Sequence, residues 1–213
     1  MKNELQKRIL SSLVLIPLAL FFIVKGSLLF NFFTLLCFIV TSYEWYIISK
    51  KKSYLFPGFV FIIFSFYTFF FFRNEIYMNF LLILLTCIST DIGGYVFGKI
   101  LKGPRLTKIS PNKTYSGMFG GFLLALVSAN IYLNNLKFLL IGDNIKMEIM
   151  LFITVLLISF VSQIGDITIS FFKRKSKIKN TGNIIPGHGG LLDRIDGMIF
   201  AFPFVYIIIK IIS

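Results

Sequence analysis

The chain has 213 residues, of which 56% are apolar and only 15% are charged. This composition provides too little polar surface to cover a water-soluble globule, so it predicts an integral membrane protein. The 22 Lys and Arg residues against nine Asp and Glu residues give a formal net charge of +13, which in a membrane protein favours lipid headgroups over nucleic acid as partners.

Apolar runs follow one another along the whole chain. They cover residues 9–24, 27–48, 55–72, 76–98, 116–133, 148–172 and 195–212. Each run is close to the roughly 20 residues that a helix needs to cross a bilayer. We therefore predict an all-α, polytopic integral membrane protein with about seven transmembrane helices. Seven such spans take up most of the chain, so we expect residues 1–213 to form a single membrane domain.

Basic residues are distributed unequally between the two sides of these spans. The segments on the same side as the N-terminus hold 17 of the 22 Lys and Arg residues, and the segments on the other side hold five. Because cytoplasmic connections carry the excess of Lys and Arg, this asymmetry predicts a cytoplasmic N-terminus. Two connections on that side, 99–115 and 173–194, are rich in Gly, Pro, Lys and Asn. We therefore expect the functional site on the cytoplasmic side.

Three acidic residues, Glu44, Asp91 and Asp166, fall near the cytoplasmic ends of predicted spans. An ionised side chain at the centre of a membrane helix costs roughly 2.5–3.5 kcal/mol, so each of the three is a candidate functional residue. Glu44 lies between Tyr43 and Trp45. These aromatic neighbours favour the interpretation of Glu44 as a headgroup-level residue bonded to a neighbouring helix.

Asp166 begins a stripe of polar residues along one helix face. Ser170 follows at i+4, and Lys173 and Arg174 follow at i+7 and i+8. Such a face suits a metal-bound polyphosphate, because the carboxylate can bind the divalent ion while the cations bind free phosphate oxygens. The alternative is that the two basic side chains only extend to the membrane surface, with Asp166 paired to one of them.

The connection before the last span combines glycines with acidic residues. Gly187, Gly189 and Gly190 let consecutive N–H groups approach an anion, so they predict a phosphate-binding loop at the start of the last helix. Asp193 and Asp196 are spaced i, i+3 in the first turn of that helix and can face one side. Capping of the helix N-terminus is the alternative role for these acids.

The residue types available as metal ligands narrow the choice of cofactor. His188 is the only histidine, and Cys37 and Cys87 both lie within apolar runs. A His-based or Cys-based zinc site is therefore excluded. Carboxylate oxygens remain, and they favour magnesium bound together with substrate phosphates.

The connection 99–115 places basic side chains and hydroxyls beside Asp91. Its turn-forming stretch from Ser110 to Thr114 includes Lys113 and leads to glycines of the next helix, which permit close packing. A loop that is basic only because it is cytoplasmic is the alternative. We expect a functional role, with Lys113 binding phosphate.

These motifs resemble those of the phosphatidate cytidylyltransferase family, also called CDP-diacylglycerol synthases. The resemblance covers about half of the chain and places the catalytic half at about residues 86–200. One part consists of Thr90-Asp91, Gly94-Tyr95, Gly98-Lys99, Ser110 to Thr114 and Gly117, and the other of Gly165-Asp166, Ser170 to Arg174, Lys179, Gly182 and Pro186 to Asp196. The chain departs from the family pattern at Ser116 and Asn180, where the family usually has an acid.

The resemblance implies a membrane nucleotidyltransferase that makes CDP-diacylglycerol and pyrophosphate from CTP and phosphatidate in phospholipid biosynthesis. It implies Mg²⁺ as the cofactor and leaves room for a second metal ion, which could be monovalent. It also implies a multi-pass protein of a bacterial-type inner membrane with a cytoplasmic active site, and it leaves a homodimer open. Nucleic acid is not an expected partner.

Combined with this resemblance, the residues identified above take three kinds of role. The predicted catalytic residues are Asp166, Asp193, Lys173 and Arg174. The predicted metal ligands are Asp166, Asp193 and Asp196. The predicted substrate-binding residues are Asp91, Lys113, Ser170, Gly187, His188, Gly189, Gly190 and Arg194.

Two other functions compete with this interpretation. A related lipid or polyprenol kinase would also place nucleotide phosphates against membrane carboxylates, and its phospholipid product would distinguish it. A small transporter would use Asp91 and Asp166 as ion-coupling residues. That class is expected to show inverted repeats or broken helices in matching halves, and the sequence shows no such pattern.

Overall fold

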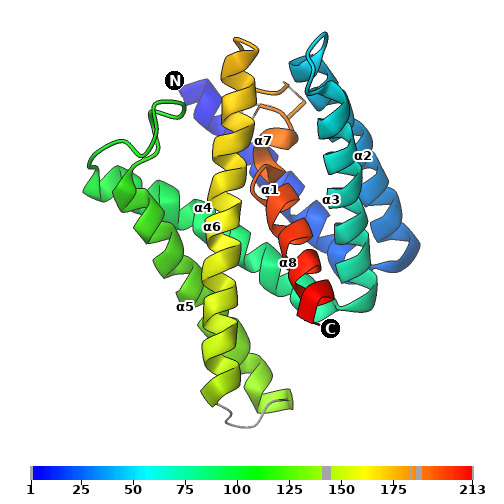
Figure 1. The fold of residues 1–213 in the computed structure, drawn as a ribbon, viewed down its shortest axis with the longest axis vertical. Coiled ribbons are helices and arrows are strands. Elements are labelled where there is room, and N and C mark those ends of the chain that lie inside the picture. The colour runs from blue at the N-terminus through cyan, green and yellow to red at the C-terminus, as the bar shows by residue number, and fades with distance from the viewer. Residues whose placement is uncertain (1, 141–144, 183, 186–188, 213) are drawn as a thin grey trace.

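The computed structural model of the protein is a bundle of helices and describes residues 2–140, 145–182, 184–185 and 189–212 (Figure 1). The helices are α1 (Lys2–Lys25), α2 (Ser27–Ser49), α3 (Leu55–Glu75), α4 (Tyr77–Leu101), α5 (Tyr115–Leu140), α6 (Ile145–Lys175), α7 (Leu192–Ile195) and α8 (Met198–Ile212). Those described ranges contain no strand, and their isolated β-bridges join Arg105 to Thr114 and Ile185 to Gly189. The predicted all-α fold is confirmed.

Five helices in the described part of the chain are long and apolar enough to cross a membrane. Their apolar stretches are Leu28–Ser49, Leu55–Glu75, Tyr77–Leu101, Tyr115–Asn134 and Ile149–Lys175. The stretches Leu13–Lys25 in α1 and Met198–Ile211 in α8 are apolar but shorter. Each of the seven predicted runs therefore contains a helix. Five of them have the length of a full span, and the count of about seven spans stays a prediction.

The last predicted span, 195–212, differs from the structure at its beginning. The short helix α7 ends in a turn at Asp196 and Gly197 before α8 starts. Gly197 lies so close to α6 that a Cβ at this position would collide with the hydroxyl of Ser162. Asp193 therefore lies in α7 and Asp196 at its C-terminal end, and not in the first turn of the long helix as predicted.

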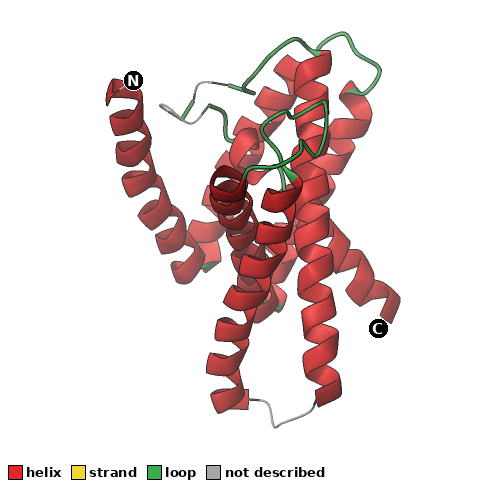
Figure 2. Ribbon diagram, turned by 90° about the vertical axis from the view of Figure 1, so that its left-hand side faces the viewer, coloured by secondary structure: helices red, strands yellow, loops and turns green. Residues whose placement is uncertain are grey.

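The connections alternate between the two ends of the bundle. Figures 1 and 2 show the start of α1, the 102–114 connection and the described parts of the 176–191 segment toward one end, and the end of α8 toward the other. This arrangement matches the alternation inferred from the basic residues. The cytoplasmic location of the first end stays a prediction.

Aromatic side chains fill the interior toward the opposite end. Phe72 of α3 and Phe202 of α8 are fully buried. The ring of Phe202 lies 4.3 Å from that of Phe69 and 5.2 Å from that of Phe80, centroid to centroid. Edge-on and tilted contacts of this kind stabilise an apolar core. The polar residues of α4, α6 and α7 are left at the other end of the bundle.

Helices α4 and α5 cross closely through glycines. A Cβ at Gly93 would lie 2.8 Å from the carbonyl carbon of Gly120 and 2.9 Å from the Cα of Gly121. Five residues further along α4, a Cβ at Gly98 would lie 3.6 Å from the Cα of Gly117. Small residues allow two helix backbones to approach in this way. The crossing places the inner part of α4 beside the turn that precedes α5.

Gly93→Ala is expected to lower the free energy of unfolding by about 1–3 kcal/mol, because its Cβ would overlap backbone atoms of α5, which cannot rotate away. Gly94→Ala is the matched control, since the nearest atom to its Cβ, the Gly117 carbonyl oxygen, is 3.8 Å away. Thermal unfolding of the two purified variants measures the difference. Equal unfolding midpoints would contradict the close crossing.

Candidate active site

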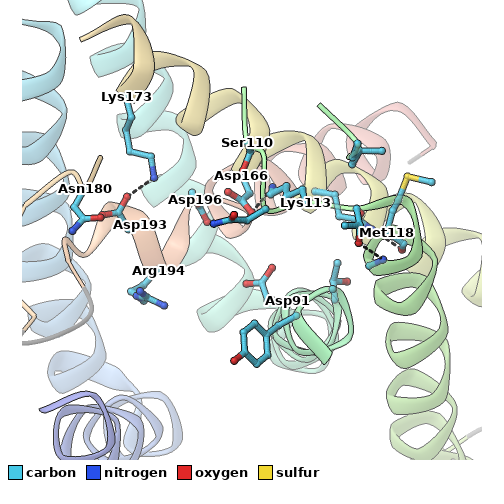
Figure 3. Close-up of a pocket in the computed structure, with 18 residues that line it drawn as sticks. Asp91, Ser110, Lys113, Met118, Asp166, Lys173, Asn180, Asp193, Arg194 and Asp196 are labelled. Atoms are coloured by element: carbon cyan, nitrogen blue, oxygen red, sulfur yellow. Dashed lines mark hydrogen bonds and ion pairs between the residues drawn. The ribbon is translucent and has the colours of Figure 1, made fainter. Parts of the chain in front are cut away.

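A cavity of about 420 Å³ opens beside the 102–114 connection (Figure 3). Small-molecule sites usually have volumes of about 300–1,000 Å³. The walls come from α4, the start of α5, α6, α7 and the 102–114 connection. Seven of the predicted site residues line it: Asp91, Lys113, Asp166, Lys173, Asp193, Arg194 and Asp196. Polar lining residues to which the sequence assigned no role are Thr90, Tyr95, Ser110, Asn112, Thr114, Gln163 and Asn180.

Helix α6 presents two residues of its predicted stripe, Asp166 and Lys173, to this cavity, whereas Ser170 and Arg174 do not line it. The hydroxyl of Ser170 donates to Asp166 Oδ1 at 3.4 Å, and Asp166 and Lys173 both line the cavity. Seven residues make about two helical turns, so Lys173 is aligned with Asp166, whereas Arg174 is turned by about a further 100°. Arg174 is exposed and does not line the cavity. The structure does not bring it to the other residues, and its catalytic role stays a prediction.

The turn before α5 carries Lys113 into the cavity. The Lys113 carbonyl accepts the N–H of Leu106 at 2.7 Å, which closes the turn. The side chain of Thr114 accepts the N–H of Gly117 at 3.1 Å and so caps the start of α5. Between these contacts, Lys113 Nζ forms an ion pair with Asp166 of α6 (Figure 3). The connection thus brings a cation to the predicted site.

Asp193 is held by three donors. Lys173 Nζ donates to Oδ1 at 2.6 Å, and Oδ2 accepts the N–H groups of Thr181 at 2.9 Å and Gly190 at 3.2 Å. The N-cap residue of α7 is Leu191, which has no side-chain capping bond, so the bond from Gly190 ties Asp193 to the segment before the helix. Both carboxylate oxygens are engaged by the protein itself, so the predicted metal-ligand role of Asp193 requires an exchange of partners.

The glycine-rich segment before α7 is folded around carboxylates of the protein. The N–H of Gly190 donates to Asp193, and the N–H groups of Leu191 and Leu192 donate to Glu44 at 2.9 and 2.8 Å. An N–H that already has a carboxylate acceptor would have to leave it before binding phosphate. These three amides are therefore committed to internal anions in this structure.

The phosphate-binding loop predicted from the glycines is only partly described. Gly189 has a φ of +87°, which favours glycine, but neither Gly189 nor Gly190 lines the cavity. Gly187 and His188, the other predicted members, lie outside the described residues. Their phosphate-binding roles stay predictions.

Glu44 is bonded across the bundle, as its interpretation as a residue tied to a neighbouring helix expected. Its side chain is fully buried and accepts N–H groups at the start of α7, and its level in the membrane stays a prediction. The acid itself could be noticed in the sequence because it falls within a predicted span. Its partners could not, because they lie 137 to 148 residues away along the chain.

Three carboxylates converge on the cavity from different elements. Figure 3 shows Asp91 reaching up from α4 toward Asp166 and Asp196, with Lys113 beside Asp166. Asp196 lies between α7 and α8, outside the membrane-spanning helices, and is 7% exposed. Its burial, together with the carboxylates of Asp166 and Asp91, raises the pKa of Asp196 well above its usual range. A bound cation would relieve this crowding of negative charge.

The carboxylates that line the cavity suit magnesium better than a metal ion whose ligands all come from the protein. Within the described residues, no group of three or more His, Cys, Asp or Glu side chains is arranged to hold a metal ion. Mg²⁺ keeps several waters and binds through one or two carboxylates plus substrate phosphates. Asp166, Asp196 and Asp91 could supply such carboxylates from the cavity wall.

Comparison with known proteins identifies the family. The model of the cytidylyltransferase family matches residues 53–212. The chain belongs to this family. The match includes every residue that lines the cavity and begins after Glu44. The resemblance inferred from the sequence motifs is confirmed.

Several curated relatives share the name phosphatidate cytidylyltransferase. The protein of this name from Rickettsia bellii is 37% identical over 211 residues, which cover 97% of this chain and 91% of that protein. The one from Rickettsia felis is 35% identical over 218 residues, with 97% and 93% covered. The one from Bacillus subtilis is 42% identical over 126 residues, with 59% of this chain and 45% of that protein covered.

Proposed function

We propose that this protein is a phosphatidate cytidylyltransferase, which makes CDP-diacylglycerol and pyrophosphate from CTP and phosphatidate. The observation that carries the proposal is a cavity, at the ends of apolar helices, in which carboxylates meet ammonium groups. These groups belong to Asp91, Asp166, Asp196, Lys113 and Lys173. Such a polar site beside membrane helices suits a reaction between a water-soluble nucleotide and a lipid. The relatives of this name match nearly the whole chain.

In this reaction a phosphate oxygen of phosphatidate attacks the α-phosphorus of CTP. The bond between the α-phosphorus and the oxygen that bridges it to the β-phosphate breaks, and pyrophosphate leaves with that oxygen. The protein supplies no covalent nucleophile. Its task is therefore to align the two phosphates and to neutralise their charge.

Lys113 and Lys173 are the side chains best placed to bind the triphosphate. Both line the cavity, and their ammonium groups are paired with Asp166 and Asp193. Incoming phosphate oxygens would replace these carboxylates as partners of the two lysines, which would free acid oxygens for a metal. Arg194 lines the same cavity and is the third cation of the proposed substrate site.

Asp166 and Asp196 would hold the magnesium ion proposed as cofactor together with substrate phosphates, with Asp91 beside them on the cavity wall. When bound, the ion supplies positive charge that offsets the phosphate charge in the transition state. Asp193 would join these ligands once Lys173 binds phosphate, because its Oδ1 is then released. We include a second metal ion at the same site in this proposal.

Label transfer tests the proposed function directly. Purified protein incubated with magnesium, phosphatidate and CTP labelled at the α-phosphate is expected to move label into the lipid phase. CTP labelled at the γ-phosphate is expected to leave its label in soluble pyrophosphate. Lipid labelling from the γ-phosphate alone would show a kinase and would contradict the proposal.

We also propose that the protein is multi-pass in a bacterial-type inner membrane, with about seven spans, a cytoplasmic N-terminus and a cytoplasmic site. The distribution of basic residues supports this orientation. In a variant lacking Cys37 and Cys87, Lys177→Cys, after α6, should react with a membrane-impermeant maleimide in inside-out vesicles and stay unlabelled in intact cells. Glu75→Cys, at the end of α3, should show the reverse pattern. Labelling of Lys177→Cys from outside would overturn the orientation.

A further inference from the structure

The carboxylate of Glu44 joins α2 to both ends of the 181–192 segment. The Glu44 side chain is 0% exposed. Its Oε1 accepts the N–H of Leu191 at 2.9 Å, and its Oε2 accepts the hydroxyl of Thr181 and the N–H of Leu192, both at 2.8 Å. One buried side chain therefore fixes the beginning of the segment to its end.

Two glycines of this segment leave space for the carboxylate. A Cβ at Gly182 would lie 2.9 Å from Glu44 Oε1. A Cβ at Gly190 would lie 2.5 and 2.6 Å from the two carboxylate oxygens. Any larger residue at either position would displace Glu44 or the backbone of the segment. The missing side chains at Gly182 and Gly190 therefore make room for the Glu44 carboxylate. Neither glycine lines the cavity.

The segment that Glu44 fixes leads directly into the acids of the cavity. Asp193 follows Leu192, whose N–H donates to Glu44. Asp193 also accepts the N–H of Thr181 at 2.9 Å, so Thr181 bonds one acid through its backbone and the other through its hydroxyl. A shift of this segment at Glu44 would therefore move Asp193 and, three residues later, Asp196.

We propose that Glu44 is a positioning residue for cytidylyl transfer, which holds the 181–192 segment so that the acids of α7 face the cavity. Glu44 does not line the cavity and acts through the segment. It also lies outside the family match, which begins at residue 53. The inference rests on the proposed function and adds to it a residue from α2.

Glu44→Gln tests the role with the smallest change of shape. The amide replaces one acceptor oxygen with an NH₂ donor, so in either orientation the NH₂ faces the N–H of Leu191 or Leu192. That N–H loses its acceptor, and the segment is expected to loosen. We expect kcat/KM to fall at least tenfold, mainly through kcat, because the α7 acids lose their alignment. Glu44→Asp keeps both acceptors and should recover part of the loss.

Thr41→Val is the matched control for this variant. Thr41 lies one turn before Glu44 on α2 and is equally buried, and its hydroxyl has no hydrogen-bond partner among the described residues. Activity of this variant should stay within twofold of wild type.

A labelling experiment without substrate detects the loosened segment itself. Ile185 lies in the segment and is 8% exposed. In the background lacking native cysteines, Ile185→Cys should react slowly with a water-soluble maleimide, and at least tenfold faster when combined with Glu44→Gln. Lys177→Cys, which is exposed outside the segment, should react at the same rate in both backgrounds.

Wild-type activity in Glu44→Gln would overturn the positioning role, and so would an unchanged reaction rate of Ile185→Cys. A lower unfolding midpoint without faster labelling would mean that Glu44 supports the fold as a whole, which also contradicts the proposal. Failure of the proposed function is a separate result, seen as absence of lipid labelling by the wild-type protein.

Discussion

Asp166→Asn is expected to lower kcat/KM for cytidylyl transfer at least ~100-fold, equivalent to about 2.7 kcal/mol of transition-state stabilisation. Asp166 lies on the cavity wall with its side chain 32% exposed, paired with Lys113 and bonded to Ser170. Asn keeps the size and the bond from Ser170 but removes the charge that would bind magnesium. The measurement is label transfer to lipid at several magnesium concentrations.

A catalytic loss at Asp166 can be separated from a folding loss. Removing an ionised group from a membrane helix eases insertion. The yield and the unfolding midpoint of the Asn variant should therefore be at least equal to those of wild type. Thr168→Val is the control on the same helix, because Thr168 is only partly buried and its hydroxyl donates to the Ile164 carbonyl of its own helix at 2.8 Å. Its activity should stay within about twofold of wild type. Near-wild-type turnover of Asp166→Asn would remove Asp166 from the metal site.

Most helix positions could be predicted because apolar runs end abruptly at polar residues. The runs 27–48 and 55–72 correspond to α2 (Ser27–Ser49) and α3 (Leu55–Glu75), with Lys50 to Lys52 between them. A membrane helix must satisfy all its backbone hydrogen bonds internally, so a run of about 20 apolar residues has few alternatives to a helix. For α2 and α3 the predicted and observed boundaries therefore agree within three residues, whereas α1 begins and α5 ends seven residues beyond the predicted runs.

Contacts between distant segments could not be predicted in the same way. The turn at Gly197 depends on Ser162 of α6, 35 residues earlier, and the place of Glu44 depends on residues near 181 and 191. No local pattern of apolar and polar residues encodes such partners. For the same reason, the sequence assigned the amide of Gly190 to an incoming phosphate, whereas the structure gives it to Asp193.

Spacing alone also left two adjacent cations with equal roles. Lys173 and Arg174 follow Asp166 at i+7 and i+8, and both were predicted to bind phosphate. On a helix these positions differ by about 100°, and only Lys173 lines the cavity. The neighbouring Lys175 lies over the rings of Tyr54 and Phe171, 5.0 and 5.9 Å from their centroids. The three residues therefore face different surroundings within one turn.

Lys173→Met is expected to reduce kcat/KM at least ~100-fold, because it removes a charge that would meet the reacting phosphates. Lys173 is 12% exposed on its side chain, and Asp193 is 8% exposed, so the change also leaves a nearly buried carboxylate without its cation. Breaking such a pair typically costs about 3–5 kcal/mol, so the unfolding midpoint should fall as well. Asp193→Asn in the same chain should restore part of the midpoint without restoring activity.

Arg174→Gln and Lys175→Met complete the comparison within the same turn. The geometry predicts the largest loss of activity at Lys173, a smaller loss at Arg174 and the smallest at Lys175. Lys175→Met should stay within about twofold of wild type, because Lys175 is exposed and its cation–π contacts are weak. Label transfer to phosphatidate gives the three values of kcat/KM. A loss at Arg174 equal to that at Lys173 would mean that the end of α6 turns toward the phosphates when CTP binds. In that case, Lys173 and Arg174 would both bind phosphate in the complex with CTP, as the sequence predicted.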